Sequence, residues 1–179
     1  MKKKYPLLGL TAMLTLVLLE EGSGILQVGS VAPQFKARLG SGSVISLNDY
    51  LGKKNVVLFF YPRDFTAGCT AQVCSLRDSY KELLDLDAVI LGVSRDDDTS
   101  HQKFIEANRL PFSLISDSGN SLIKAYGVER LWGLISLPKR VTYVIDKEGV
   151  IRLAAHHELF IQNHLKEVLA TLKQLNTVG

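Results

Sequence analysis

The sequence is poor in cysteine, nearly balanced in charge, and free of any apolar run long enough for a full transmembrane helix. Its 179 residues include only two cysteines, Cys69 and Cys74, which are too few for a fold held together by disulfides. Residues 25–179 contain 18 basic and 16 acidic residues, with no basic stripe interleaved with aromatic residues. These observations argue against a small disulfide-rich protein and against a nucleic-acid partner.

The longest apolar run lies near the N-terminus, where three lysines precede 15 residues from Tyr5 to Leu19. As a helix this run would reach only about 22 Å, short of a hydrocarbon core of roughly 30 Å. A basic start and a short apolar run are typical of a secretory signal, although no small-x-small pair closes the run and Glu20-Glu21 follow it. We therefore expect residues 1–24 to be an export signal or a membrane tether through residues 5–19, with a Gly/Ser linker at 22–24. The expected location is the periplasm or a lumenal compartment; a cytoplasmic protein, or an apolar helix packed on its own domain, is the alternative.

From residue 25 to residue 179 the pattern is that of one α/β domain. Parallel strand–helix units come first, and an antiparallel hairpin and a closing helix follow them. This order predicts a mixed central β-sheet with helices on both faces, which is a thioredoxin-like arrangement. The expected strands are 44–47, 56–61, 88–93, 112–115, 141–145 and 150–153, and the expected helices are 70–86, 101–108, 120–126 and 161–175.

Cys69 lies where a loop enters a helix. The loop follows residues 56–61, the strongest strand pattern in the chain, and a helical pattern begins at about Thr70. Free backbone N–H groups and the positive end of the helix dipole both favour an anion at this position. The sequence therefore favours a thiolate at Cys69.

Cys69 and Cys74 could form a structural disulfide, a metal pair or a redox pair. A metal pair needs two further ligands, and none of the four histidines has ligand spacing to the cysteines, so no metal site is expected. Five residues along a helix rise about 7.5 Å, whereas the Cα atoms of a disulfide usually lie within about 7 Å of each other. The bond would require local unwinding, which suits a reaction cycle better than a permanent crosslink. The redox interpretation is therefore favoured.

The residues before Cys69 make the redox interpretation specific. Pro62-x-x-x-Thr66-x-x-Cys69 resembles the active-site motif of the peroxiredoxins, and residues 66–74 are similar to the subgroup called peroxiredoxin Q or bacterioferritin comigratory protein. The resemblance extends over nearly everything from Val28 onward. It includes residues 28–29, 32–33, 92–94, 110–112, 116–117 and 140–146.

The resemblance implies a role for each cysteine. Cys69 would be the peroxidatic nucleophile, whose thiolate attacks the O–O bond of a peroxide and becomes a sulfenic acid. Cys74 would be the resolving cysteine and would form an intramolecular Cys69–Cys74 disulfide. Thioredoxin or a related dithiol protein would then reduce this bond by thiol–disulfide exchange.

The resemblance also implies supporting roles around the thiolate. Thr66 would hydrogen-bond the thiolate and a peroxide oxygen, and Pro62 would stiffen the loop and shield the sulfur. The backbone N–H groups of Gly68 and Cys69 would hold the peroxide. Arg140, from the family's Arg-x-Thr/Ser-aromatic strand, would favour the thiolate by its charge. Gln72 stands where the subgroup commonly has glutamate.

The resemblance therefore implies a thiol-specific peroxidase that reduces hydrogen peroxide and organic hydroperoxides in antioxidant defence. It would need no metal or cofactor, and a monomer would suffice because both cysteines lie in one chain. One alternative is a thioredoxin-like thiol–disulfide oxidoreductase, although such enzymes usually have two residues between the cysteines and this chain has four. Another is a non-enzymatic redox sensor that uses the same disulfide.

Overall fold

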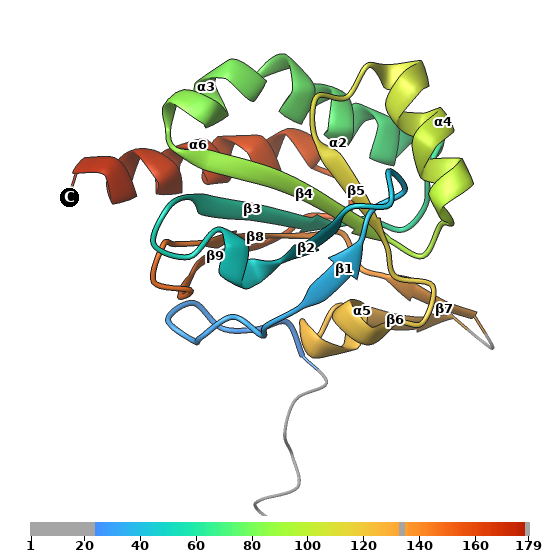
Figure 1. Ribbon diagram of the computed structural model, residues 1–179, viewed down its shortest axis with the longest axis horizontal. Helices are drawn as coiled ribbons and strands as arrows, with labels where there is room; N and C mark the ends of the chain where they lie inside the picture. The colour runs from blue at the N-terminus through green and yellow to red at the C-terminus, as the bar shows by residue number, and fades with distance from the viewer. Residues whose placement is uncertain (1–23, 133–134, 178–179) are drawn as a thin grey trace, which may run out of the picture.

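In a computed structural model, the protein is built on one five-stranded sheet (Figure 1). The structure describes residues 24–132 and 135–177. The strand order is β5-β4-β3-β8-β9; the first three strands run parallel, and β8 and β9 pair antiparallel. The strands are β3 (Asn55–Phe60), β4 (Ala88–Ser94), β5 (Ser113–Ser116), β8 (Val141–Ile145) and β9 (Ile151–His156).

Both faces of this sheet are covered, but unequally. Four helices pack on one face, and one short helix and a small hairpin cover the other (Figure 1). The first group is α2 (Ala67–Asp78), α3 (Tyr80–Asp85), α4 (Asp98–Asn108) and α6 (Ile161–Thr177). The second is α5 (Ser121–Ala125), the hairpin β1 (Lys36–Arg38)–β2 (Val44–Ser46) and the 3-10 helix η1 (Leu47–Asp49). The predicted mixed sheet with helices on both faces is confirmed.

Strand β3 forms the centre of the core. Its residues are all buried, and alternate side chains enter different clusters on the two faces of the sheet. Val57 and Phe59 pack under α2, α4 and α6, whereas Leu58 and Phe60 pack against the β1–β2 side. A strand buried on both faces has no polar alternation, which is why residues 56–61 formed the clearest strand pattern in the sequence.

The structure differs from the sequence prediction in one helix and in three strands. The expected helix 70–86 is two helices, α2 and α3, interrupted at Ser79, and it begins at Ala67. The apolar residues keep their helical spacing on both sides of Ser79, so the sequence pattern did not indicate the break. Strand β1 and the hairpin β6 (Glu129–Trp132)–β7 (Ile135–Pro138) were not expected. All three strands are short and belong to two-stranded sheets, and such elements give weak sequence patterns.

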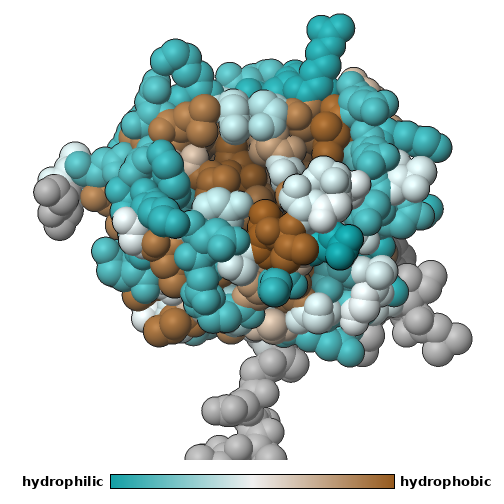
Figure 2. Space-filling model, viewed as in Figure 1, coloured by the Kyte–Doolittle hydropathy of each residue, from teal (hydrophilic) through white to brown (hydrophobic). Residues whose placement is uncertain are grey.

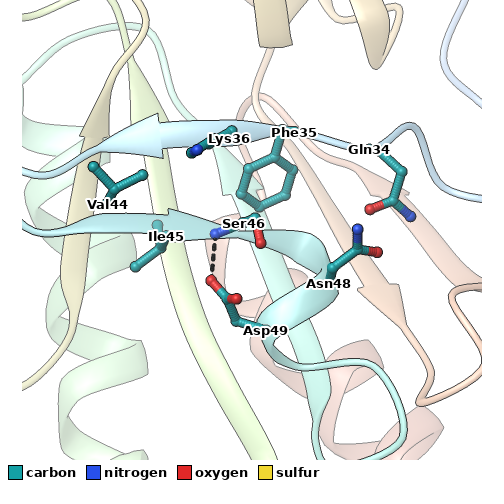
Figure 3. A pocket seen from close by; sticks show the side chains of 8 residues that line it. All are labelled: Gln34, Phe35, Lys36, Val44, Ile45, Ser46, Asn48 and Asp49. Carbon is teal, nitrogen blue, oxygen red and sulfur yellow. Dashed lines mark hydrogen bonds between the residues drawn. The ribbon is translucent and has the colours of Figure 1, made fainter.

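A large surface pocket lies away from the cysteines. Its volume is about 640 Å³, and it lies between β1, β2 and η1, lined by residues such as Gln34, Lys36 and Asp49 (Figure 3). Two of its polar lining groups hydrogen-bond each other, because Ser46 N–H donates to Asp49 Oδ2 at 2.7 Å. On the face seen in Figure 2, hydrophobic surface gathers near the centre with hydrophilic residues around it. The lining of the pocket includes neither Cys69 nor Cys74, so this pocket is separate from the cysteines on α2.

Candidate active site

Cys69 lies in the first turn of α2, directly after the loop that leaves β3. Thr66 is the N-cap, and the first intrahelical bond runs from Thr70 N–H to Thr66 O at 2.8 Å. The N–H groups of Ala67, Gly68 and Cys69 therefore precede the helical ladder and can bind an anion or a polarised oxygen. Cys69 itself is fully buried against the sheet.

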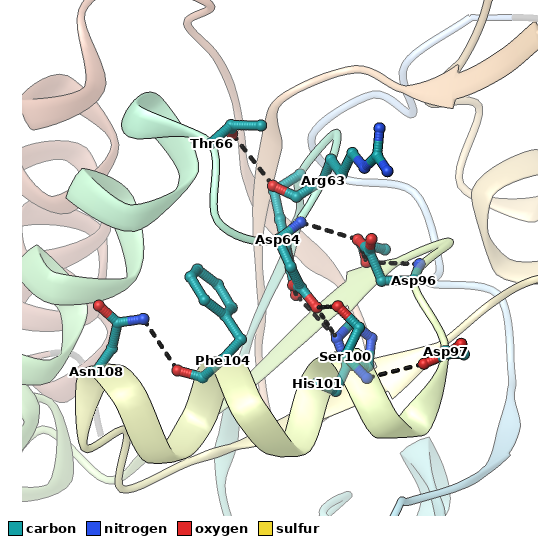
Figure 4. Close-up of polar contacts among 11 residues, drawn as sticks. Arg63, Asp64, Thr66, Asp96, Asp97, Ser100, His101, Phe104 and Asn108 are labelled. Atoms are coloured by element: carbon teal, nitrogen blue, oxygen red, sulfur yellow. Dashed lines mark hydrogen bonds and ion pairs between the residues drawn. The ribbon is translucent and has the colours of Figure 1, made fainter.

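A buried carboxylate holds the loop in place (Figure 4). Tyr61 donates to Asp64 Oδ1 at 2.7 Å, and Ser100 donates to Oδ2 at 2.7 Å, where His101 Nδ1 also lies at 2.9 Å. The Asp64 N–H in turn donates to Asp96 Oδ2 at 2.9 Å. Burial alone would raise the pKa of Asp64, but hydrogen bonds from His101 and Ser100 outweigh it and lower this pKa. No pattern in the sequence pointed to this anchor, since His101 follows Asp64 by 37 residues.

Thr66 and its neighbour Phe65 form the outer side of the loop. The Thr66 hydroxyl donates to Arg63 O at 3.1 Å, which leaves its lone pairs to accept a proton from a bound ligand. Phe65 has a positive φ of 59° and packs edge-on against Phe104 on α4. The bond from Thr66 to the Cys69 sulfur that the sequence suggested is therefore replaced by a bond within the loop. Pro62 is half-buried at the start of this loop.

Arg140 contacts Cys69 although it lies 71 residues further along the chain. It lies just before β8, is only 5% exposed, and donates from Nη2 to Cys69 Sγ at 3.4 Å. Its Nη1 donates to Gln72 Oε1 at 2.7 Å, and its Nε has no hydrogen-bond partner among the residues that the structure describes. A Cβ on Gly68 would lie 3.1 Å from Nη2, so the absence of a side chain at Gly68 leaves room for the guanidinium. The predicted neighbours Cys69, Gly68 and Arg140 thus lie together.

Further hydrogen bonds extend from Gln72 away from the cysteine. Gln72 Nε2 donates to Thr142 Oγ1 at 3.4 Å, and Thr142 Oγ1 lies 2.9 Å from His164 Nδ1 on α6. His164 Nε2 lies 2.9 Å from the carbonyl oxygen of His157. Sequence reasoning did not identify Thr142 or His164 as part of the site. The only available signal was that Thr142 follows Arg140 by two residues, which puts both side chains on one face of the strand.

Cys74 lies on a different side of α2. Five residues turn a helix by about 140° beyond a full turn and raise it by about 7.5 Å. Cys74 is half-buried, and its thiol donates to Asn108 Oδ1 on α4 at 3.7 Å, whereas Cys69 faces Arg140. Both thiols are free, and an intact α2 separates them. Within residues 24–132 and 135–177, no three His, Cys, Asp or Glu side chains are placed to hold a metal ion.

Burial of His164 makes the stability of the fold depend on pH. Desolvation lowers the pKa of His164 from its ordinary 6.5 to about 4. Between these values the unfolded chain binds a proton that the folded chain does not bind, so stability falls as pH falls through this window. This histidine is expected to remove about 3 kcal/mol between pH 6.5 and pH 4.

Denaturant unfolding of wild type and His164→Asn across this pH range measures the effect. The carboxylates contribute equally to both proteins, so the difference in stability between them should narrow as the solution becomes more acidic. Two parallel pH profiles would contradict the prediction.

Comparisons with known proteins identify the family to which the chain belongs. The model of the AhpC/TSA family matches residues 28–154. A chloroplastic peroxiredoxin Q of Triticum aestivum is 42% identical over 153 residues, covering 85% of this chain and 69% of that protein. Peroxiredoxin Bcp of Bacillus subtilis (strain 168) is 38% identical over 155 residues, covering 84% and 98%.

Solved structures show the same fold. The crystal structure of peroxidoxin BcpB from Mycobacterium tuberculosis has a TM-score of 0.78 at 32% identity and covers 83% of this chain and 97% of that one. A structure of the Xanthomonas campestris bacterioferritin comigratory protein, described in relation to alkyl peroxide reduction, has a TM-score of 0.72 at 28% identity and covers 78% and 90%. The thioredoxin-like fold expected from the sequence is confirmed.

The prediction of an exported or membrane-tethered protein is wrong. One of the relatives named above is called chloroplastic and another is a bacterial Bcp, and neither name describes an exported or membrane-anchored protein. Among the described residues, no helix has the length and apolar character needed to cross a membrane, and residues 5–19 lie outside them. The expectation rested on a basic start and a short apolar run, a composition that is weak evidence without the small-x-small pair of a cleaved signal. The cytoplasmic alternative stays a prediction.

The family also decides among the three functions that the cysteine pair allowed. The family model covers most of the chain, and relatives at about 40% identity are named peroxiredoxins. This confirms the peroxidase interpretation over the oxidoreductase and sensor alternatives. The chain belongs to the AhpC/TSA family, within its peroxiredoxin Q and Bcp group, and is a thiol peroxidase.

Proposed function

We propose that Cys69 is the peroxidatic cysteine of this peroxidase. The observation that carries the proposal is the 3.4 Å contact between Arg140 Nη2 and the buried Cys69 sulfur at the start of α2. A guanidinium and a helix N-terminus both favour negative charge on that sulfur. The thiolate attacks one peroxide oxygen, the O–O bond breaks, and the second oxygen leaves and takes a proton as water or an alcohol. The sulfur is oxidised to a sulfenic acid by two electrons, and the peroxide is reduced by two.

Several donors can hold the peroxide during this attack. The N–H groups of Gly68 and Cys69 precede the helical ladder, and the Nε of Arg140 has no partner among the described residues. Preorganised donors of this kind stabilise the charge that develops on the leaving oxygen. Thr66 keeps acceptor capacity for the peroxide proton, and Pro62 fixes the start of the loop.

We assign Cys74 as the resolving cysteine. Its thiol attacks the sulfur of the Cys69 sulfenic acid, the S–O bond breaks, and water leaves as the Cys69–Cys74 disulfide forms. The two side chains face different neighbours on an intact α2, so the first turns of this helix must unwind for the step to occur. A thioredoxin-type dithiol then reduces the disulfide by thiol–disulfide exchange.

Exposed apolar side chains support organic hydroperoxides as substrates beside hydrogen peroxide. Ile161 Cδ1 would lie 3.3 Å from a Cβ on Gly68, so the start of α6 borders the site. The two residues before it, Leu159 and Phe160, are 84% and 68% exposed, and Phe65 on the active-site loop is 55% exposed. These side chains offer apolar contacts to an alkyl group attached to the reacting oxygens.

A Cys74→Ser variant tests the division of roles. It is expected to react with hydrogen peroxide within about threefold of the wild-type rate, because Cys69 Sγ faces Arg140 whereas Cys74 faces Asn108. It should then stop at the sulfenic acid and show no turnover with thioredoxin. Stopped-flow measurements followed by a count of free thiols and sulfenic-acid trapping give both results.

Loss of the fast peroxide step in Cys74→Ser would contradict the assignment of Cys74. Wild type that is oxidised once by peroxide but is not recycled by any dithiol would argue against the proposed recycling route. Asn108→Ala is the matched control, because it removes the partner of the Cys74 thiol and leaves both cysteines in place.

A further inference from the structure

Hydrogen bonds connect Arg140 through Gln72 and Thr142 to His164 on α6, and the donor and the acceptor of each can be assigned in only one way. The carbonyl oxygen of His157 can only accept, so the His164 Nε2 facing it at 2.9 Å carries the ring proton. His164 is buried and neutral near neutral pH, so its Nδ1 is an acceptor and the Thr142 hydroxyl must donate to it. The Thr142 oxygen then accepts from the amide nitrogen of Gln72.

This assignment fixes which end of the Gln72 amide faces Arg140. A guanidinium has only donors, and the amide offers it an acceptor only if Oε1 points toward it. In the structure Oε1 accepts from Arg140 Nη1 at 2.7 Å, while Nε2 is directed at Thr142. A reversed amide would place Nε2 against the guanidinium, and two donors would then face each other in a buried site.

We propose that His164 is a positioning residue of the peroxidase: as a neutral acceptor it orients Thr142 and Gln72, and through them it holds Arg140 against the Cys69 sulfur. This inference rests on the proposed role of Cys69. It adds a function for a residue of α6 whose hydrogen bonds go to Thr142 and His157 and not to the sulfur or the guanidinium. A glutamate in place of Gln72 would accept from Arg140 through either oxygen and would need no such orientation, so His164 matters because this chain has glutamine.

Substitution of His164 tests the proposal through the rate of the first chemical step. His164→Leu removes the acceptor, and we expect the reaction of Cys69 with hydrogen peroxide near neutral pH to slow about tenfold, which is below the roughly hundredfold that a misplacement of about 1 Å can cost. Alkylation of Cys69 by iodoacetamide should slow in parallel in a Cys74→Ser background. His164→Asn restores an acceptor for Thr142, and it should recover most of the lost rate.

A double-mutant cycle separates positioning from a general structural role. His164→Leu should slow the peroxide step about tenfold in the protein with its native Gln72 and less than about twofold in a Gln72→Glu background. Val168→Ala is the matched control, because this residue lies one turn further along α6, is fully buried, and belongs to the apolar cluster. It should lower the melting temperature and leave the peroxide rate unchanged.

The same tests can overturn the proposal. A folded His164→Leu protein with the wild-type rate, or an equal loss in the native and Gln72→Glu backgrounds, would do so. Should His164→Leu fail to fold, the ring nitrogens of wild type decide by NMR: a proton on Nε2 is expected, and a proton on Nδ1 would reverse the argument. If Cys69→Ser still reacts with peroxide, the proposed function is wrong. If Cys69→Ser does not react but His164→Leu reacts at the wild-type rate, only the role of His164 is wrong.

Discussion

Replacement of Cys69 by serine is expected to lower the rate of hydrogen peroxide reduction by at least about a thousandfold. A hydroxyl has the size of the thiol but is scarcely ionised near neutral pH, and it cannot accept an oxygen atom as sulfur does. Because Cys69 is fully buried beside Arg140, the isosteric change leaves the surroundings in place and removes only the reacting atom. Stopped-flow mixing of reduced protein with peroxide measures the loss directly.

Two controls make this result specific to the sulfur. The Cys69→Ser protein should unfold at nearly the wild-type temperature, which excludes a damaged fold as the cause. Cys74→Ser should keep the fast step, since its side chain faces Asn108 on α4. If Cys69→Ser consumed peroxide as fast as wild type, Cys69 could not be the peroxidatic residue, and the role of the loop before α2 would have to be reconsidered.

The position of Cys69 at the start of a helix could be predicted from the sequence because the signals for it are local. The apolar run of β3 fixed the position of the loop, and the proline and threonine before Cys69 gave the motif. Cys69 lies at the start of a helix as expected, although that helix begins three residues earlier than predicted, at Ala67. Arg140 was placed by its motif, and no spacing argument could have brought it 3.4 Å from a sulfur 71 residues away.

The rest of the site depends on packing between distant segments. Gln72 and Thr142 are 70 residues apart, and Thr142 meets His164 only because α6 crosses the same face of the sheet as α2. A lone histidine on an amphipathic helix carries no mark in the sequence that separates a hydrogen-bond partner from an ordinary core residue. The anchor at Asp64 is hidden in the same way, since Ser100 and His101 reach it from α4.

Removal of the guanidinium is the second large effect that the structure predicts. Arg140→Leu is expected to slow the reaction with peroxide by about a hundredfold to a thousandfold, the range seen when a preorganised donor is lost. Arg140 donates to both the sulfur and Gln72 and keeps Nε free among the described residues, so one substitution removes the cation beside the thiolate and a donor for the peroxide. Arg140→Lys keeps the charge but loses the planar guanidinium with its several N–H donors, so it should recover only part of the rate.

The measurement is the second-order rate constant for hydrogen peroxide, with iodoacetamide alkylation of Cys69 as a separate readout of the thiolate. If Arg140 acts on both thiolate and peroxide, the peroxide rate should fall more than the alkylation rate in Arg140→Leu. Arg152→Leu is the matched control, since that arginine on β9 pairs with Asp146 and has no contact with the cysteine. Equal losses in the two reactions would mean that Arg140 serves only the thiolate, and the peroxide would then be held by the N–H groups of Gly68 and Cys69 at the start of α2.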